Sequence, residues 1–332
     1  MAAYLAPPVY AAFVWWFSTG AVLLLVGLSA RFDVLRLLVA SMLTAAALYG
    51  LVSSANEMSV GSAYTAFTAT ILLWGAQEIA FLAGWLTGPR PEPCPADARG
   101  VRRLRLALSA ILYHELSLIA CGVAIVVATY GGSNPVGLWT FAALWVLRQS
   151  AKINLFLGVP VTNDALMPQQ VAFLKTYFAR KPVGAFFMLS VTLAIAVLAI
   201  MIQRMVEIAV TPFEIASLGL VCALFALGVV EHWFMLLPLP AITLWGWGVR
   251  SQVSQEGTMG PDHIVLDQAP AIAEPRMAPP QLTIVAGSKR DARQRLEDQF
   301  RQRFLEQNAH PDNTTTADSG VESVAMGNGR TS

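Results

Sequence analysis

Long apolar runs separated by short polar segments are the feature of this sequence that most restricts its fold. They lie near residues 10–30, 34–53, 63–86, 106–130, 136–156, 183–203 and 213–237. Most are long enough for a helix to cross the hydrocarbon of a bilayer, which takes about 20 residues. Only 13% of the 332 residues are charged, which is about half the share found in soluble domains. The runs therefore predict an all-α, polytopic membrane helix bundle with seven transmembrane helices.

The positive charges predict how this bundle sits in the membrane. Arginine and lysine gather after the first, third and fifth runs. The 87–105 segment alone contains five arginines, whereas the 131–135 segment, GGSNP, carries no charge. Because positively charged loops stay in the cytoplasm, we expect a periplasmic N-terminus, a cytoplasmic C-terminus and a multi-pass protein of the cell inner membrane. Trp245 and Trp247 follow the last run and are expected near the lipid headgroups.

Composition divides the chain into two parts. Residues 1–250 hold the transmembrane helix bundle and a long cytoplasmic loop at 153–182, whereas residues 251–332 form a polar cytoplasmic tail. The flanks of the tail are rich in Pro, Gly, Asn, Thr and Ser, and this composition predicts disorder. A short amphipathic helix is expected near 289–306, where apolar residues recur at every fourth position. That helix is either solvated or docks on a partner or on the membrane surface.

Polar side chains inside the apolar runs are the first candidate site. A charge at mid-bilayer costs roughly 2.5–3.5 kcal/mol, so each such group needs a partner or a purpose. On the expected topology, four runs place polar groups in the same cytoplasmic half of the bilayer. Glu78, for example, lies about nine residues, or roughly 13 Å, from the cytoplasmic end of its run. The cluster consists of Glu78, His114, Glu115, Arg148, Lys152, Asn154, Glu231 and His232.

Two interpretations of this cluster remain open. In the structural one, Arg148 and Lys152 neutralise the carboxylates, and the imidazoles form hydrogen bonds between helices. In the functional one, the cluster binds a tetrapyrrole whose magnesium takes a histidine ligand, or it binds a translocated ion. We expect Glu231 to pair with Arg148 or Lys152. We expect His232 to face a pigment or a partner helix.

Motifs of several enzyme and receptor classes are missing from the sequence. It contains no Gly-rich phosphate loop, no HExxH and no GxSxG, which are the signatures of nucleotide-binding proteins, metalloproteases and serine hydrolases. The last apolar run has no lysine that could hold retinal, and three cysteines give no disulfide framework. The charges form no large basic domain for nucleic acid. We therefore expect a protein that is not an enzyme, and we assign no catalytic or metal-binding residues.

The loop at 153–182 is the second candidate site. Loops longer than about 12–15 residues without regular structure are often functional. Gly158 and Pro160 are expected to end the preceding helix, and Pro168 to start a short amphipathic one. Its apolar face should enter the acyl chains while its basic groups meet headgroups, and the helix is either a plain re-entry into the next span or a partner-binding platform. The residues singled out are Phe156, Gly158, Pro160, Asn163, Asp164, Pro168, Lys175, Tyr177, Arg180 and Lys181.

Three stretches of sequence carry a resemblance to a known family. They read LWVLRQSAKINLFLGVPVTNDALMPQQVAFLKTYFARKP, YHELSL and VVEHWFMLLPLP. They resemble the PuhE family, which consists of photosynthetic complex assembly proteins of purple phototrophic bacteria encoded near reaction-centre genes. The resemblance covers roughly residues 5–250, and the tail has no counterpart.

The resemblance implies a helper in the assembly of the bacterial photosynthetic reaction centre and light-harvesting complexes. Its location would be the photosynthetic (intracytoplasmic) part of the inner membrane. Its partners would be the lipid bilayer, subunits of these complexes and other assembly factors. Bacteriochlorophyll or a precursor would be a candidate ligand for it to handle, and no catalytic residues are implied. The alternative is a membrane enzyme or transporter that acts on a tetrapyrrole precursor or an ion.

Overall fold

The computed structural model describes residues 2–162, 164–237 and 244–248. The tail at 251–332, with the helix expected near 289–306, lies outside these residues. The long helices are α1 (Ala2–Val26), α2 (Asp33–Ser54), α3 (Val60–Leu82), α4 (Gly100–Ala128), α5 (Val136–Leu157), α6 (Ala185–Glu207) and α7 (Pro212–Trp233). No strand occurs in the described part of the chain, so the prediction of an all-α protein is confirmed.

Six of these helices are long and apolar enough to cross a membrane, namely α1, α2, α3, α4, α6 and α7. The protein is therefore a multi-pass membrane protein. The helix α5 has 22 residues, and at about 1.5 Å per residue it is as long as a span. It differs from the others because polar residues interrupt its second half.

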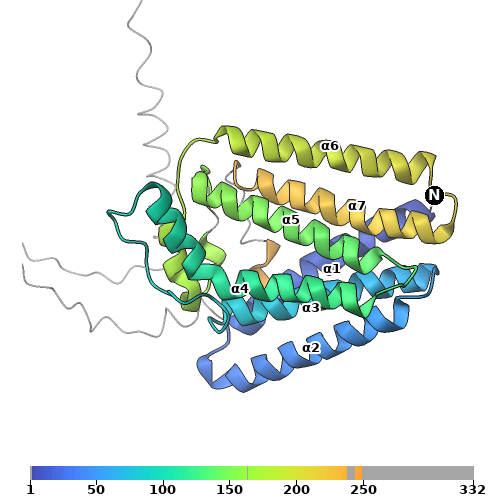
Figure 1. Ribbon diagram of the computed structural model, residues 1–332, viewed down its shortest axis with the longest axis horizontal. Coiled ribbons are helices and arrows are strands. Elements are labelled where there is room, and N and C mark those ends of the chain that lie inside the picture. The colour runs from blue at the N-terminus through green and yellow to red at the C-terminus, as the bar shows by residue number, and fades with distance from the viewer. Residues whose placement is uncertain (1, 163, 238–243, 249–332) are drawn as a thin grey trace, which may run out of the picture. The chain divides into compact units, whose positions relative to one another are not determined.

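Successive helices run back and forth along one common direction, so their connections gather at two ends of the bundle (Figure 1). The long connections 83–99 and 158–184 lie at one end, which we call the loop end. The short connections 55–59, 129–135 and 208–211 lie at the other, which we call the turn end. Every odd-numbered helix finishes at the loop end, so residues late in α3, α5 and α7 meet there.

The core of the bundle lies around α3 and α7, whose apolar windows are the most buried of the six. Phe67 of α3 and Leu220 of α7 are fully enclosed in a cluster that also takes in Ala11 of α1 and Val136 of α5. In contrast, α6 is the least buried helix and packs mainly on α7. The central position of α3 and α7 places their polar residues inside the protein.

The helix α3 ends earlier than the apolar run predicts. Gly84 has a φ of 82°, a left-handed conformation that favours glycine and terminates helices. The amides of Trp85 and Leu86 then turn back to the carbonyl oxygen of Ala80. Glu78 is thus four residues from the helix end (82 − 78 = 4), or roughly 6 Å, rather than the expected 13 Å.

The short helix expected in the long loop is present, but it is a 3-10 helix, η3 (Gln169–Tyr177). Three residues per turn bring Val171, Leu174 and Tyr177 onto one face, and all three are buried. They pack with Phe81 of α3. The expectation that the apolar face of this helix enters the acyl chains is therefore wrong, because that face is covered by the bundle itself.

Trp245 and Trp247 both contact the first helix. Trp245 is buried, and its Nε1 donates to the carbonyl oxygen of Trp16 at 3.1 Å. Its ring meets that of Trp15 edge-on, with centroids 5.3 Å apart. Trp247 stacks on Phe17 at 6.0 Å. Both tryptophans pack on α1, and their position near the headgroups stays a prediction.

Candidate functional site

One polar stretch of α5, Arg148–Asn154, bonds to α3, α4, α6 and α7, and we call it the hub. Arg148 Nη2 pairs with Glu78 Oε2 of α3 at 3.2 Å. Lys152 Nζ pairs with Glu115 Oε1 of α4 at 2.5 Å. Each of these two carboxylates therefore has its own cation. This arrangement agrees with the structural interpretation of the cluster, in which α5 neutralises the acids of its neighbours.

His232 of α7 is held by the hub and by its own helix. Its Nε2 lies 2.9 Å from Ser150 Oγ, and its Nδ1 lies 2.7 Å from the carbonyl oxygen of Gly228. A carbonyl oxygen only accepts, so Nδ1 donates to it, and in the neutral ring Nε2 accepts from Ser150. His232 is also buried. Of the two neighbours expected for it, a pigment or a partner helix, the ring meets a helix, namely α5.

Glu231 has a partner different from the expected one. Its Oε1 accepts a hydrogen bond from Trp15 Nε1 of α1 at 2.7 Å. Within the described residues it forms no ion pair with Arg148 or Lys152, because the carboxylates of α3 and α4 occupy both cations. Glu231 and His232 are adjacent in sequence, yet one bonds to α1 and the other to α5. Their roughly 100° separation around the helix explains the split.

His114 of α4 is the polar residue whose environment is hardest to explain. Its side chain is fully buried, and its ring stacks on that of Phe81 with centroids 4.2 Å apart. Neither ring nitrogen has a hydrogen-bond partner among the residues that the structure describes. The helix α4 thus holds Glu115 toward α5 and His114 toward α3.

Neither histidine of the bundle is placed to bind the magnesium of a tetrapyrrole. A magnesium tetrapyrrole needs a histidine nitrogen with a free lone pair and open space beside it. His232 has both nitrogens engaged, and His114 is enclosed. In the described part of the chain, no group of three or more His, Cys, Asp or Glu could hold a metal ion. The arrangement ties helices together rather than offering a coordination site.

The sequence patterns do not indicate four partners of this cluster, namely Trp15, Gln149, Ser150 and Ser190. Gln149 donates to Glu115 Oε2 at 2.6 Å, and Asn154 donates to Ser190 Oγ of α6 at 3.1 Å. These partners are uncharged, so the sequence of an apolar run gives little sign that they belong to a polar cluster. Gln149 and Ser150 lie in the same RQSAK segment as the cations, and that position is the signal that could have found them.

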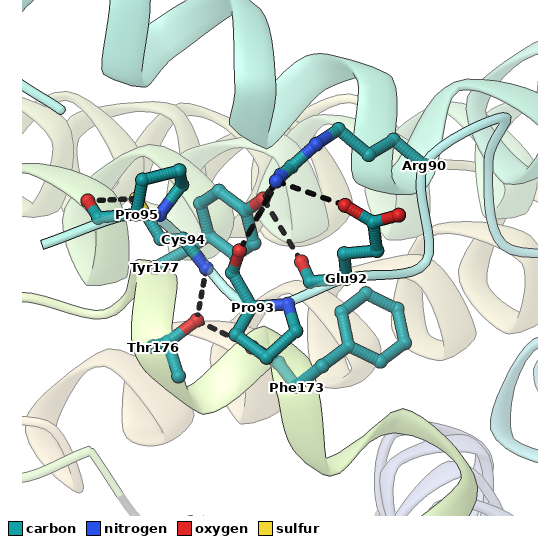
Figure 2. A network of polar contacts seen from close by, with 8 residues as sticks. All are labelled: Arg90, Glu92, Pro93, Cys94, Pro95, Phe173, Thr176 and Tyr177. Atoms are coloured by element: carbon teal, nitrogen blue, oxygen red, sulfur yellow. Dashed lines mark hydrogen bonds and ion pairs between the residues drawn. The ribbon is translucent and has the colours of Figure 1, made fainter.

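The two long connections at the loop end are bonded to each other, and we call this pair, 83–99 and 158–184, the platform. Figure 2 shows its centre, where Arg90 Nη1 donates to the Tyr177 hydroxyl at 2.7 Å. That hydroxyl donates in turn to the carbonyl oxygen of Glu92 at 3.1 Å. Burial raises the pKa of Tyr177, so its hydroxyl stays protonated and keeps both roles at neutral pH.

Further contacts fasten the platform to the helices. The Cys94 amide donates to Thr176 Oγ1 at 2.8 Å (Figure 2). Arg103 of α4 donates to the carbonyl oxygens of Phe156 at 3.1 Å and Tyr177 at 2.6 Å. The Arg103 guanidinium also lies 4.1 Å from the centre of the Phe156 ring. The platform is therefore a folded surface attached to the ends of α4 and α5.

The structure also places the other loop residues that the sequence singled out. Gly158 follows the end of α5 with a φ of 137°, so the predicted helix end is confirmed. Asp164 pairs with Arg180 at 3.0 Å, and Asn163 lies outside the described residues. Of the remainder, Pro160 and Lys181 are exposed, Lys175 is half-buried and Pro168 is buried.

Replacing Tyr177 with phenylalanine is expected to loosen the 83–99 connection, because Arg90 and the Glu92 carbonyl lose their shared partner. Hydrogen exchange should show faster exchange at the Cys94 amide. The wild-type contact should itself persist at neutral pH and weaken above the ordinary tyrosine pKa of about 10, because ionisation of the buried hydroxyl removes the donated bond. Thr65→Val, in an exposed part of α3, is the control. Unchanged exchange in Tyr177→Phe would contradict this account of the platform.

The hub and the platform both fall inside a recognisable family. Residues 1–256 match the model of a family described as "Protein of unknown function (DUF3623)". The chain belongs to the DUF3623 family. A relative from Rhodobacter capsulatus, called "Uncharacterized 30.4 kDa protein in puhA 5'region", is 36% identical over 267 residues, which are 79% of this chain and 92% of the relative. No solved structure matches the chain. The DUF3623 match ends soon after α7, so most of the tail lies beyond it.

The contacts of His232 in this DUF3623 protein predict a structural effect. His232→Phe should lower the free energy of unfolding by about 1–3 kcal/mol, because the Ser150 hydroxyl loses its partner inside the bundle. Denaturation of the purified protein in detergent measures this change. Trp233→Phe, at the exposed neighbouring position, should have little effect. Equal stability of His232→Phe and wild type would contradict the assignment.

Proposed function

We propose that the protein is an inner-membrane assembly factor for the photosynthetic reaction centre and light-harvesting complexes, as its resemblance to the PuhE family implies. The observation that carries the proposal is the name of its relative, which places that protein in the puhA 5' region, a photosynthesis gene region. Bacterial genes that lie together often serve one process. The shared family over residues 1–256 supports carrying this context over to the present chain.

The geometry of the hub favours a role without catalysis. Glu78 and Glu115 are each paired with a cation of α5, so these four charges stabilise the bundle rather than act on a substrate. A membrane enzyme or an ion transporter gains no support from this arrangement. The platform supports the assembly role, since it is a folded surface that exposes basic residues such as Arg99 and Lys181 to a client or a second assembly factor.

We also propose that α5 crosses the membrane as the seventh span, with the N-terminus in the periplasm. Its charged groups are paired with those of α3 and α4, which lowers the cost of placing them in a bilayer. The loop end carries many arginines and lysines, whereas Arg204 is the one cation near the turn end in the described residues. Positive segments stay in the cytoplasm, so the platform and the tail at 251–332 would be cytoplasmic.

Reporter fusions test this topology. A reporter joined at Gly100, the first residue of α4, should give a cytoplasmic signal, and one at Ser133, between α4 and α5, a periplasmic signal. A periplasmic signal at Gly100 would contradict the orientation. A cytoplasmic signal at both positions would show that α4 does not cross the membrane, and the seven-span arrangement would then be wrong.

Co-purification from pigmented membranes tests the function. The full-length protein with an affinity tag should bring down reaction-centre or light-harvesting subunits in a mild detergent. A variant with Arg180→Glu and Lys181→Glu, which reverses charge on the platform, should recover less of them. Arg204→Glu at the turn end is the matched control. A preparation free of photosynthetic subunits, from cells that contain the assembled complexes, would contradict the proposal.

A further inference from the structure

A groove between α5, α6 and α7 opens near the turn end, which is the opposite end of the bundle from the platform. Its volume is about 800 Å³. Its walls are mostly apolar and include Trp139 and Val146 of α5, Val197 of α6 and Phe225 of α7. No residue of the hub or the platform lines it, so the groove is a separate feature of the molecule.

The groove exists because α6 is held firmly at one end alone. The buried residues of α6 are Phe187 and Val191, both in its first third, and the bond from Asn154 to Ser190 lies in the same region. Beyond Val191 no residue of α6 is buried in the described structure. The second half of α6 therefore rests on α7 and leaves space beside α5.

The dimensions of the groove suit an acyl chain rather than a partner helix. Along α7 its lining extends from Phe213 to Phe225, or twelve residues (225 − 213 = 12), which is roughly 18 Å. Half of the hydrocarbon thickness of a bilayer is about 15 Å, so the groove spans about one leaflet. A 20-residue helix about 10 Å wide would occupy roughly 2,400 Å³, far more than the groove provides.

Two polar groups of the groove have no partner among the described residues. Arg204 is exposed and forms no ion pair there, and it lines the groove at the turn end. Glu214, its acidic neighbour in the lining, is engaged instead, because its Oε2 accepts from the amides of Val210 and Thr211. Ser217 Oγ is buried and without a hydrogen bond. The groove thus offers a free cation and, further along α7, a free hydroxyl.

We propose that the groove binds one anionic phospholipid from the leaflet at the turn end. The acyl chains would lie along the apolar walls, the Arg204 guanidinium would bind the headgroup phosphate, and Ser217 would donate to an ester carbonyl. Charge decides between lipid classes, because Arg204 has no ion-pair partner in the described residues, whereas the Glu214 carboxylate is held by the amides of Val210 and Thr211 and is not free to bind a cationic headgroup. This site is independent of the proposed assembly function and rests on α5, α6 and α7 forming part of the membrane bundle.

Native mass spectrometry of the delipidated full-length protein tests the site, using phosphatidylglycerol and phosphatidylcholine with identical acyl chains. Wild type should bind phosphatidylglycerol about fivefold more tightly, as expected for one cation near a charged lipid. Arg204→Gln should remove this preference. Arg105→Gln, at an exposed cation of the loop end, should retain it. Equal binding of both lipids by wild type, or a preference that survives Arg204→Gln, would overturn the proposal.

A second variant tests the groove itself. Ala142 lines the groove on α5, and Ala142→Phe should fill part of it and reduce the binding of both lipids. Leu138→Phe, on the same helix but outside the lining, should leave binding unchanged. Thermal unfolding of both variants shows whether the fold is intact. Wild-type lipid binding by a folded Ala142→Phe protein would place the lipid elsewhere and overturn the proposal.

Discussion

Arg148→Met is expected to lower the free energy of unfolding by about 3–5 kcal/mol, because it leaves a buried carboxylate without its cation. The carboxylate is Glu78 of α3, whose side chain is 12% exposed. Its second oxygen, Oε1, already lacks a hydrogen-bond partner among the described residues. Loss of Arg148 would therefore leave the Glu78 charge inside the bundle without its ion-pair partner. Unfolding of the purified protein in mixed detergent micelles, followed by circular dichroism, measures the change.

A double substitution separates the effect of the unpaired charge on stability from the effect of the changed side-chain shape. Glu78→Gln together with Arg148→Met removes both charges, so no unpaired carboxylate stays in the bundle. Only the Glu78 side of the pair is buried, since the Arg148 side chain is 40% exposed, and replacing both partners costs far less than leaving a buried charge alone. The double variant should therefore be more stable than Arg148→Met alone. The exposed pair of Arg102 and Asp97, with side chains 59% and 70% exposed, is the control, since Arg102→Gln should cost about 0–1 kcal/mol. Equal losses in Arg102→Gln and Arg148→Met would contradict the hub.

Gly88→Ala is expected to detach the 83–99 connection from α4. A Cβ at position 88 would lie 2.0 Å from the carbonyl oxygen of Ser109 and 2.7 Å from the carbonyl carbon of Ala110. Both atoms belong to the helix backbone, which cannot move aside as a side chain can. Overpacking costs about 1–3 kcal/mol. The cost of a clash with the backbone of both residues should lie at the upper limit of this range. The segment should therefore leave its position, and the platform should open.

Limited proteolysis with proteinase K, a protease of broad specificity, measures this opening, since the backbone of the 83–99 connection becomes accessible when the segment is released. Gly75→Ala is the control, because a Cβ at position 75 meets nothing within 4 Å. Alanine is also the better helix former by about 1 kcal/mol, so this variant should be at least as stable as wild type. Identical cleavage of Gly88→Ala and wild type would contradict the close approach of the connection to α4.

The helices of this protein could be predicted from the sequence because their length and composition follow from the thickness of a bilayer. The end of α3 could not be placed from hydropathy, because Gly84 terminates the helix within an apolar stretch. The short helix of the loop was expected with an α-helical period. Its buried residues Val171, Leu174 and Tyr177 are instead three apart, a periodicity that a nine-residue segment is too short to reveal.

The gathering of polar residues at one end was predictable, but their pairing was not. The depth of a residue along each run follows from its number, so it could be predicted that the polar residues of α3, α4, α5 and α7 lie at a similar depth. The choice of partner depends on how each helix is rotated about its axis, and the sequence does not state that rotation. For this reason Arg148 binds Glu78 rather than Glu231, and His232 meets Ser150 rather than a ligand.

The central claim is that this protein serves the assembly of photosynthetic complexes, and absorption spectroscopy of membranes tests it most directly. Cells that lack the gene should carry either the wild-type gene or an empty vector, and transcripts of the complex subunits should be measured in parallel. We predict that cells with the empty vector show reduced absorption from the reaction centre or light-harvesting complexes at unchanged transcript levels, and that the wild-type gene restores it. Identical membrane spectra with and without the gene would contradict the claim.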